Sequence, residues 1–143
     1  MKTLGENEKY GEQMNQITHY LDGSTVYGSD DEDAKELRKF SGGLLKIHNP
    51  SHGKGLLPQE EEKGENECQI SKQKQERDNL KCFKAGDSRS NEQPGLAVYH
   101  TVWIREHNRI AKELYYLNPH WDDERLYQES RRIAVAELQV GSD

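Results

Sequence analysis

The chain has 143 residues, in which 26 aspartates and glutamates outnumber 20 lysines and arginines and give a formal net charge of −6. This acidic balance, with a sequence pI of about 5.5, argues against a nucleic-acid partner, because such a partner requires a basic surface. Charged residues make up 32% of the chain and the mean hydropathy is −1.13, so the apolar content is low for a self-sufficient core and we expect part of a larger folded body.

The chain begins with a polar lead-in, residues 1–11, which lacks the apolar stretch of a signal peptide. Taken at face value this start predicts a cytosolic protein, and taken as the start of a fragment it says nothing about location. No apolar run in the sequence is long enough to cross a bilayer, so we expect no membrane span.

The first informative stretch, THYLDGSTVYGS at residues 18–29, gathers oxygen-bearing side chains around a glycine. Thr18, Asp22, Ser24 and Thr25 could offer carboxylate, hydroxyl and carbonyl oxygens to a hard cation such as calcium, which prefers oxygen ligands. A surface turn rich in Asp, Gly and Ser is the alternative, and these residues alone leave it open.

A short helix is predicted over residues 30–40. Ser29 followed by Glu32 is a capping-box pattern, and acidic residues in the first turn suit the helix dipole. The sequence SGG at residues 41–43 ends this helix. Residues 44–51 then predict a short strand or an extended segment that leads into a turn.

Residues 59–81 form a polar segment with an acidic half and a basic half, a pattern typical of a solvated loop. Cys68 and Cys82 flank most of it, and a disulfide between them would close a loop of about 15 residues, worth on the order of 3 kcal/mol. Two cysteines alone do not establish a bond, since in a reducing compartment they would remain thiols. They also lack the four-ligand pattern of a structural zinc site.

Two amphipathic helices are predicted after residue 93. Pro94 suits the first turn of the first helix, and Asp122 is the predicted N-cap of the second, with acidic residues in its first turn. The sequence NPH at residues 118–120 separates the two helices. Apolar residues recur with a helical period and predict two buried stripes, Leu96, Tyr99, Trp103, Ile110, Leu114 and Leu117 in the first helix and Leu126, Ile133 and Leu138 in the second.

The stretch AGDSRSNEQP at residues 85–94 is the second candidate for chemistry. Arg89 and Glu92 are three residues apart, so on a helical turn they would share a face, either as a salt bridge or as two groups aimed at one ligand. His100 and His107 could be imagined as haem or zinc ligands two helical turns apart. That spacing is weak evidence, because no further metal-binding cluster accompanies it.

Four stretches, in this order and spacing, resemble the animal haem peroxidases: LDGSTVYGS, AGDSRSNEQP, REHNRIAKEL and LNPHWDDERLYQESRRI. The resemblance covers residues 12–139 almost continuously and leaves residues 140–143 as a non-matching tail. It implies a mainly α-helical fold with few short strands and long polar loops, and haem buried between helices. The implied activity is a peroxidase, an oxidoreductase that uses hydrogen peroxide to oxidise a halide, phenol or tyrosine donor and responds to oxidative stress.

By this resemblance the loop at residues 18–24 matches a structural calcium site of the family. Thr18 would give hydroxyl and carbonyl oxygens, Tyr20 a backbone carbonyl, Asp22 a carboxylate and Ser24 its hydroxyl, all of them hard donors that calcium prefers. One further aspartate ligand of the family lies upstream and has no match in this chain, so the implied site is short of a carboxylate.

Arg89 matches the distal arginine of the family. Cleavage of the peroxide O–O bond builds negative charge on the departing oxygen, and a fixed guanidinium stabilises that charge. Glu92 matches the glutamate that forms an ester to a haem methyl in members with covalently attached haem, so haem b is the implied cofactor beside calcium. Gln93 stands where one branch of the family has a methionine bonded to a haem vinyl, and an amide cannot form that link.

Cys68 and Cys82 match a local disulfide pair of the family, which implies an extracellular enzyme or one in the secretory pathway. Residues 105–109, REHNR, are expected to support packing and buried polar contacts around the haem and not to be catalytic. These roles come from the resemblance, and the residues themselves leave them open.

In the family order the distal histidine lies before residue 1 and the proximal histidine, which ligates iron, lies beyond residue 143. The chain is therefore interpreted as an internal fragment that needs the rest of the peroxidase and does not turn over peroxide alone. An alternative is a non-catalytic calcium-binding or adhesion module on a peroxidase scaffold. A partly disordered acidic interaction segment is disfavoured by the helical stripes after Pro94.

Overall fold

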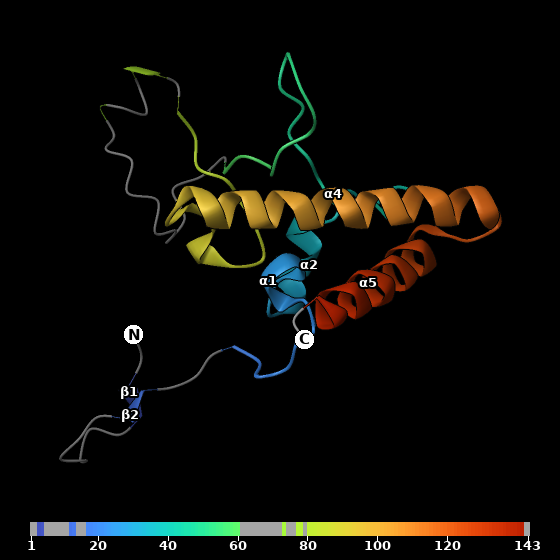
Figure 1. Ribbon diagram of the computed structural model, residues 1–143, viewed down its shortest axis with the longest axis horizontal. Coiled ribbons are helices and arrows are strands. Elements are labelled where there is room, and N and C mark those ends of the chain that lie inside the picture. Colours follow the sequence, from blue (N-terminus) through green and yellow to red (C-terminus); the bar gives the residue numbers. More distant parts are fainter. Residues whose placement is uncertain are drawn as a thin grey trace.

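The computed structural model describes residues 3–4, 12–13, 17–60, 73, 77–78 and 80–141. Strands β1 (Thr3–Leu4) and β2 (Glu12–Gln13) form an antiparallel pair with Thr3 opposite Gln13. The helices are α1 (Ser24–Tyr27), α2 (Asp31–Leu37), the 3₁₀ helix η1 (Ser88–Asn91), α4 (Pro94–Leu117) and α5 (Asp123–Val140) (Figure 1). The predicted mainly α-helical fold, with few short strands and long connections, is confirmed. The predicted division into residues 1–11, 12–139 and 140–143 stays a prediction.

Helices α4 and α5 form the largest part of the fold. In Figure 1, α4 runs along the molecule, α5 folds back beneath it after the turn at residues 118–122, and α1 lies near the C-terminal end of α5. Among the helices of the described ranges, none combines the length and the apolar character that crossing a bilayer requires.

Helix α2 begins one residue later than the capping-box pattern predicted. Asp30, not Ser29, is the N-cap, and its Oδ1 accepts hydrogen bonds from the backbone N–H groups of Glu32 and Asp33, both at 2.9 Å. An aspartate is as good a cap as a serine and adds a charge that favours the positive end of the helix dipole. The predicted use of Ser29 is therefore wrong.

The same helix ends at Leu37, before the predicted boundary near residue 40. Arg38 leaves the helix in an extended conformation and forms an isolated antiparallel bridge with Leu45, and a second bridge joins His48 to Leu56. The extended segment predicted at residues 44–51 is thus present as bridge-forming backbone. Gly43 has a φ of 68°, and a Cβ there would lie 2.6 Å from the Leu126 side chain, so this turn packs directly on α5.

The local signals for the two long helices are confirmed. Pro94 occupies the first turn of α4, where its missing N–H costs no hydrogen bond. Asp122 caps α5 by accepting from the backbone N–H of Arg125 at 2.8 Å, and Asp123 and Glu124 follow in the first turn.

The predicted buried stripes are only partly right. Of the α4 stripe Ile110 is buried, but Tyr99 is 39% exposed and Leu117 is 69% exposed, while in α5 Leu126 is buried and Ile133 is 39% exposed. Polar residues take several of the buried positions, and two of them, His107 and Asn108, hydrogen-bond to the backbone of Gly43 and Leu45. The observed buried faces are His100, Thr101, Ile104, His107, Asn108, Ile110 and Ala111 in α4, and Leu126, Tyr127, Ser130 and Ala134 in α5.

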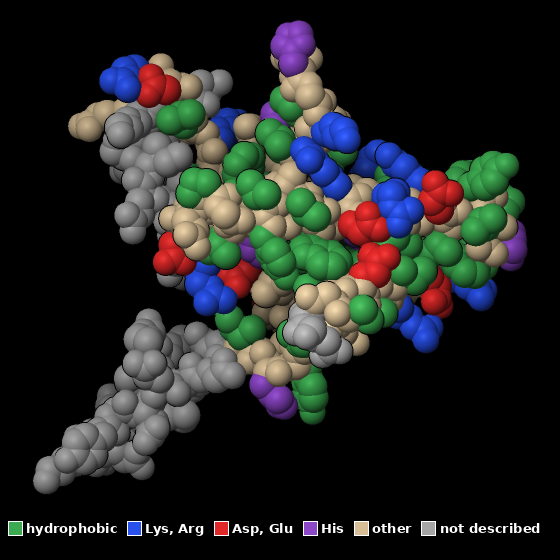
Figure 2. Space-filling model, viewed as in Figure 1, with side chains coloured by type: hydrophobic (Ala, Val, Ile, Leu, Met, Phe, Trp, Pro, Cys, Tyr) green, Lys and Arg blue, Asp and Glu red, His purple; other side chains and the backbone are tan. Residues whose placement is uncertain are grey.

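One hydrophobic core joins the helices to the loop between α2 and η1. Its buried members are Val26, Tyr27, Leu37, Leu45, Leu57, Ile104, Ile110, Tyr127 and Ala134. Other apolar side chains of α4 remain in solvent, and Figure 2 shows hydrophobic groups exposed along this helix and at its far end. Val98 is 62% exposed and Tyr116 is 82% exposed. Such a surface agrees with the expectation that this chain is part of a larger folded body.

Candidate functional site

The oxygen-rich loop before α1 is held by hydrogen bonds of its own. Thr18 Oγ1 accepts from the backbone N–H of Tyr20 at 3.1 Å, and Asp22 Oδ1 accepts from the backbone N–H of Ser24 at 3.0 Å. Gly23 has a φ of 73°, and a Cβ there would meet Val135 of α5 at 2.9 Å. The loop therefore has the hydrogen bonds of a turn, which is one of the two interpretations that its sequence left open.

The donor types of this loop suit calcium, but the set is poor in charge. Asp22 is its one carboxylate, and the remaining donors would be hydroxyl and carbonyl oxygens of Thr18, Tyr20 and Ser24. Within the described parts of the chain, no three His, Cys, Asp or Glu side chains gather so that they could hold a metal ion. Calcium binding at this loop stays a prediction.

Arg89 lies in η1 and is fixed by Asp87, the N-cap of that helix. Asp87 Oδ1 accepts from the Arg89 backbone N–H at 2.9 Å and from Arg89 Nε at 3.0 Å, and Asp87 Oδ2 accepts from Nη2 at 2.7 Å. These hydrogen bonds from Arg89 lower the pKa of the Asp87 carboxyl, against the opposing effect of its burial. The side chain of Asp87 is 10% exposed and that of Arg89 is 53% exposed.

Glu92 ends η1, and its backbone N–H donates to the carbonyl of Arg89 at 2.9 Å. The Glu92 side chain is exposed, and the Arg89 side chain is more than half exposed. The two residues are therefore neighbours on one short turn whose side chains both reach solvent. Arg89 forms an ion pair with Asp87. Sequence reasoning missed Asp87, although an aspartate two residues before the arginine at a helix start was a usable capping signal.

Asn91 closes the loop that carries Arg89. Its side-chain amide makes two hydrogen bonds with the backbone of Phe83: the Phe83 N–H donates to Oδ1 at 2.8 Å, and Nδ2 donates to the Phe83 carbonyl at 2.7 Å. Ser90 beside it is 1% exposed. The two ends of the loop from residue 83 to residue 91 are thus joined by hydrogen bonds that do not involve the Arg89 side chain.

Gly86 brings the two predicted sites together. A Cβ at this position would collide with the backbone of α1, lying 2.7 Å from the Ser24 carbonyl oxygen, so only a glycine permits the observed approach. A pocket of about 370 Å³ opens at this junction. Its lining includes Ser24 and Thr25 at the start of α1 and Asp87, Ser88 and Arg89 from the second segment.

His107 is a buried structural residue. The Gly43 carbonyl, 2.8 Å from Nε2, can only accept, so Nε2 carries the proton and Nδ1 accepts from the Tyr27 hydroxyl at 2.9 Å. Burial lowers the pKa of His107 to about 4, so the ring is neutral near pH 7. Since both ring nitrogens are occupied, the imagined metal role of this histidine is wrong.

His100 is also buried, at 4% exposure, and its Nδ1 has no hydrogen-bond partner among the described residues. Burial lowers its pKa, while the charge of Asp87 and a hydrogen bond to the Thr25 backbone act in the opposite direction. His100 thus lies between α1 and the segment that carries Arg89.

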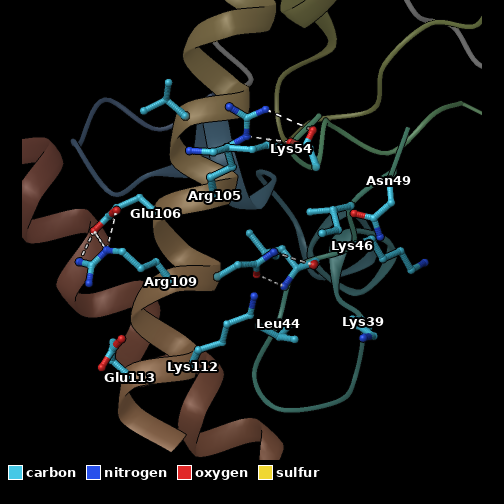
Figure 3. Close-up of a pocket in the computed structure, with 15 residues that line it drawn as sticks. Lys39, Leu44, Lys46, Asn49, Lys54, Arg105, Glu106, Arg109, Lys112 and Glu113 are labelled. Atoms are coloured by element: carbon cyan, nitrogen blue, oxygen red, sulfur yellow. Dashed lines mark hydrogen bonds and ion pairs between the residues drawn. The ribbon is translucent and has the colours of Figure 1, made fainter. Parts of the chain in front are cut away.

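Within residues 105–109, His107 and Asn108 make buried polar contacts, whereas Glu106 and Arg109 pair with each other at the surface; the predicted place of this stretch around the haem stays a prediction. Arg105 Nε donates to the Gly55 carbonyl at 2.7 Å. A pocket of about 920 Å³ lies between this part of α4 and the loop at residues 44–55, and lysine and arginine side chains line much of it (Figure 3). None of the predicted site residues lines this pocket.

Cys82 is buried and disulfide-bonded. Its predicted partner Cys68 lies outside the described residues, so the Cys68–Cys82 pairing stays a prediction.

Residues 2–140 match the family model of the animal haem peroxidase. The peroxidasin homolog of Mus musculus is 48% identical over 97% of this chain and 9% of the relative, and lactoperoxidase of Mesocricetus auratus is 44% identical over 91% and 18%. Among solved structures, peroxidase A from Dictyostelium discoideum has a TM-score of 0.77 and 35% identity, covering 90% of this chain and 24% of that one. The chain therefore belongs to the animal haem peroxidase family, and it spans only a minor part of the length of these relatives.

Proposed function

We propose that the chain is the segment of a haem-dependent peroxidase that supplies the distal arginine. Hydrogen peroxide is the oxidant, and the donor is a halide, a phenol or a tyrosine. The observation that supports this most is the match of residues 2–140 to the animal haem peroxidase family, within which Arg89 stands at the motif position of the distal arginine.

Haem, when bound, supplies the iron at which the O–O bond of peroxide breaks. The residues of this chain fit such a cofactor in kind, because Arg89 and the exposed Glu92 lie on one turn and neither side chain is enclosed by the chain itself. Glu92 would hold the cofactor, through an ester in members with covalently linked haem b. Arg89 would stabilise the negative charge on the departing oxygen with a guanidinium that is already fixed before the reaction.

The chain alone is proposed to be inactive, because none of its histidines stands at the family's distal or proximal position. His107 is fully used by Tyr27 and Gly43, and His100 is buried against α1. The remainder of the peroxidase would provide both functions and cover the exposed apolar side chains of α4.

The loop at Thr18, Tyr20, Asp22 and Ser24 is proposed to bind calcium in the complete protein. Hard oxygen donors on a loop that packs against α5 support this assignment. An extracellular or secretory location is proposed as well, and the disulfide at Cys82 supports it, because such bonds persist in oxidising compartments.

The test is an Arg89→Ala substitution in a protein that carries the complete peroxidase domain around this segment. The rate of reaction with hydrogen peroxide, followed by stopped-flow at the haem absorption band, should fall by about a hundredfold or more. Arg77→Ala is the matched control, because Arg77 is exposed and pairs with its neighbour Asp78. A wild-type rate in the Arg89→Ala protein would remove the catalytic assignment.

A further inference from the structure

Asp87 makes more contacts with Arg89 than a helix cap requires. A cap needs one oxygen that accepts from a backbone N–H, and Oδ1 does this at 2.9 Å. The carboxylate also binds the guanidinium through both oxygens, with Nε at 3.0 Å from Oδ1 and Nη2 at 2.7 Å from Oδ2. This two-point contact fixes the plane of the guanidinium as well as its position.

The two partners differ in burial in a way that indicates which one holds the other. The Asp87 side chain is 10% exposed, whereas the Arg89 side chain is 53% exposed. An exposed arginine has several freely rotating torsions and loses much entropy when it is fixed. A buried carboxylate two residues away provides the fixed point to which that side chain attaches.

The position of Asp87 is itself determined by the fold. Gly86, the preceding residue, packs against the backbone of α1 so closely that a side chain would not fit. Asn91 then ties the end of the same loop to Phe83 through two hydrogen bonds. Contacts that do not involve the Arg89 side chain thus hold the backbone on both sides of Asp87.

The contact with Asp87 engages one edge of the guanidinium. Asp87 engages the edge formed by Nε and Nη2, and the opposite edge carries Nη1. A planar guanidinium donates from both edges, so one edge can be held by the protein while the other meets a developing negative charge.

We propose that Asp87 is a positioning residue that holds the Arg89 guanidinium in a fixed orientation for the peroxide reaction. This inference rests on the proposed function for the role of Arg89, and it adds the group through which that role depends on the fold. Asp87 does not touch the reacting atoms. Its removal should matter only through Arg89.

The contact between Asp87 and Arg89 can be tested first by a measurement that needs no enzymatic activity. In the ¹⁵N-labelled 143-residue chain, the Nε–H signal of Arg89, assigned by its loss in Arg89→Lys, should exchange slowly with solvent. Asp87→Asn should raise that exchange rate by roughly tenfold, because a charge-assisted contact is replaced by a weaker one. Asp78→Asn is the matched control, since Asp78 binds Arg77 Nε at 2.7 Å and Nη2 at 2.8 Å on an exposed surface. It should leave the Arg89 signal unchanged.

The functional arm is a double-mutant cycle in the complete haem-loaded peroxidase. Asp87→Asn should slow the reaction with peroxide by roughly tenfold when Arg89 is present and should cause no further loss in the Arg89→Ala protein, because the two residues act as one unit. Equal slowing in both backgrounds would mean that Asp87 only maintains the loop, and this would overturn the inference. So would an Arg89 signal that does not respond to Asp87→Asn.

Two results separate this inference from the proposed function. If Arg89→Ala reacts at the wild-type rate while the signal still responds to Asp87→Asn, the pair exists but the catalytic role of Arg89 is wrong. If Asp87→Asn does not fold, as judged by circular dichroism, Asp87→Glu keeps the charge and displaces it by one methylene. That variant should retain slow exchange and still react more slowly, and a wild-type peroxide rate in it would count against positioning.

Discussion

The side chain of Asn108 pairs with the backbone of Leu45 as a neighbouring strand would. The Leu45 N–H donates to Asn108 Oδ1 at 2.8 Å, and Asn108 Nδ2 donates to the Leu45 carbonyl at 3.1 Å. Leu45 is 1% exposed, so water cannot replace these bonds. One amide therefore satisfies a buried N–H and a buried carbonyl and joins α4 to the extended segment after α2.

Asn108→Ala is expected to reduce the free energy of unfolding by about 2–4 kcal/mol, because it leaves two buried backbone groups of Leu45 without partners. Chemical denaturation of the chain measures this. Asn49→Ala, at an exposed asparagine, is the control and should change the value by less than about 0.5 kcal/mol. Equal values for both variants would show that the Leu45 bonds contribute nothing net.

Gly86→Ala is expected to destabilise the chain by about 2 kcal/mol or more, because the new Cβ would lie 2.7 Å from the Ser24 carbonyl and force the loop away from α1. Gly95→Ala is the matched control. Gly95 lies in the first turn of α4, where no atom of the described residues would come within 4 Å of an added Cβ, so alanine there should leave stability unchanged or raise it by up to about 1 kcal/mol. Thermal unfolding compares them, and a tolerated Gly86→Ala would contradict the close approach.

The parts of this fold that could be predicted from the sequence are those that depend on neighbouring residues. Pro94 at the first turn of α4 and the Asp122 cap of α5 act within one helical turn, so the sequence contains the whole interaction. The fold class came from the resemblance of four motifs to one family. Their order and spacing match those of a family whose fold is mainly α-helical.

The buried faces could not be predicted, because distant segments decide them. Apolar periodicity favoured Tyr99 and Leu117, yet His107 and Asn108 are buried instead. Gly43 and Leu45 offer them backbone partners that are 64 and 63 residues away, respectively. The same reason explains why the junction at Gly86 was missed. A glycine in sequence does not reveal which backbone will approach it.

His107 is expected to make the stability of the chain depend on pH. Burial lowers its pKa to about 4, below the value of about 6.5 for an unfolded histidine. Protons therefore bind the unfolded chain more strongly, and stability is fully present above about pH 6.5. As the pH falls from about 6.5 towards 4, protonation linked to His107 should lower the free energy of unfolding by up to roughly 3 kcal/mol. Denaturant unfolding at a series of pH values measures the slope.

His107→Gln should flatten that slope, and His52→Gln, at an exposed histidine, should leave it as it is. Some slope should remain in His107→Gln, because burial also lowers the pKa of His100. An unchanged slope in His107→Gln would mean that another group carries the pH dependence.

Calcium is expected to stabilise the chain through the loop before α1, with an effect that removal of a single carboxylate charge abolishes. Millimolar calcium should raise the midpoint of thermal unfolding in the wild type, since an ion that binds only the folded state shifts the equilibrium towards it. Asp22→Asn should abolish that shift while keeping an oxygen that can accept from the Ser24 N–H. Asp31→Asn, at an exposed aspartate of α2, should retain the shift. No response of the wild type, or an equal response in Asp22→Asn, would favour the turn interpretation.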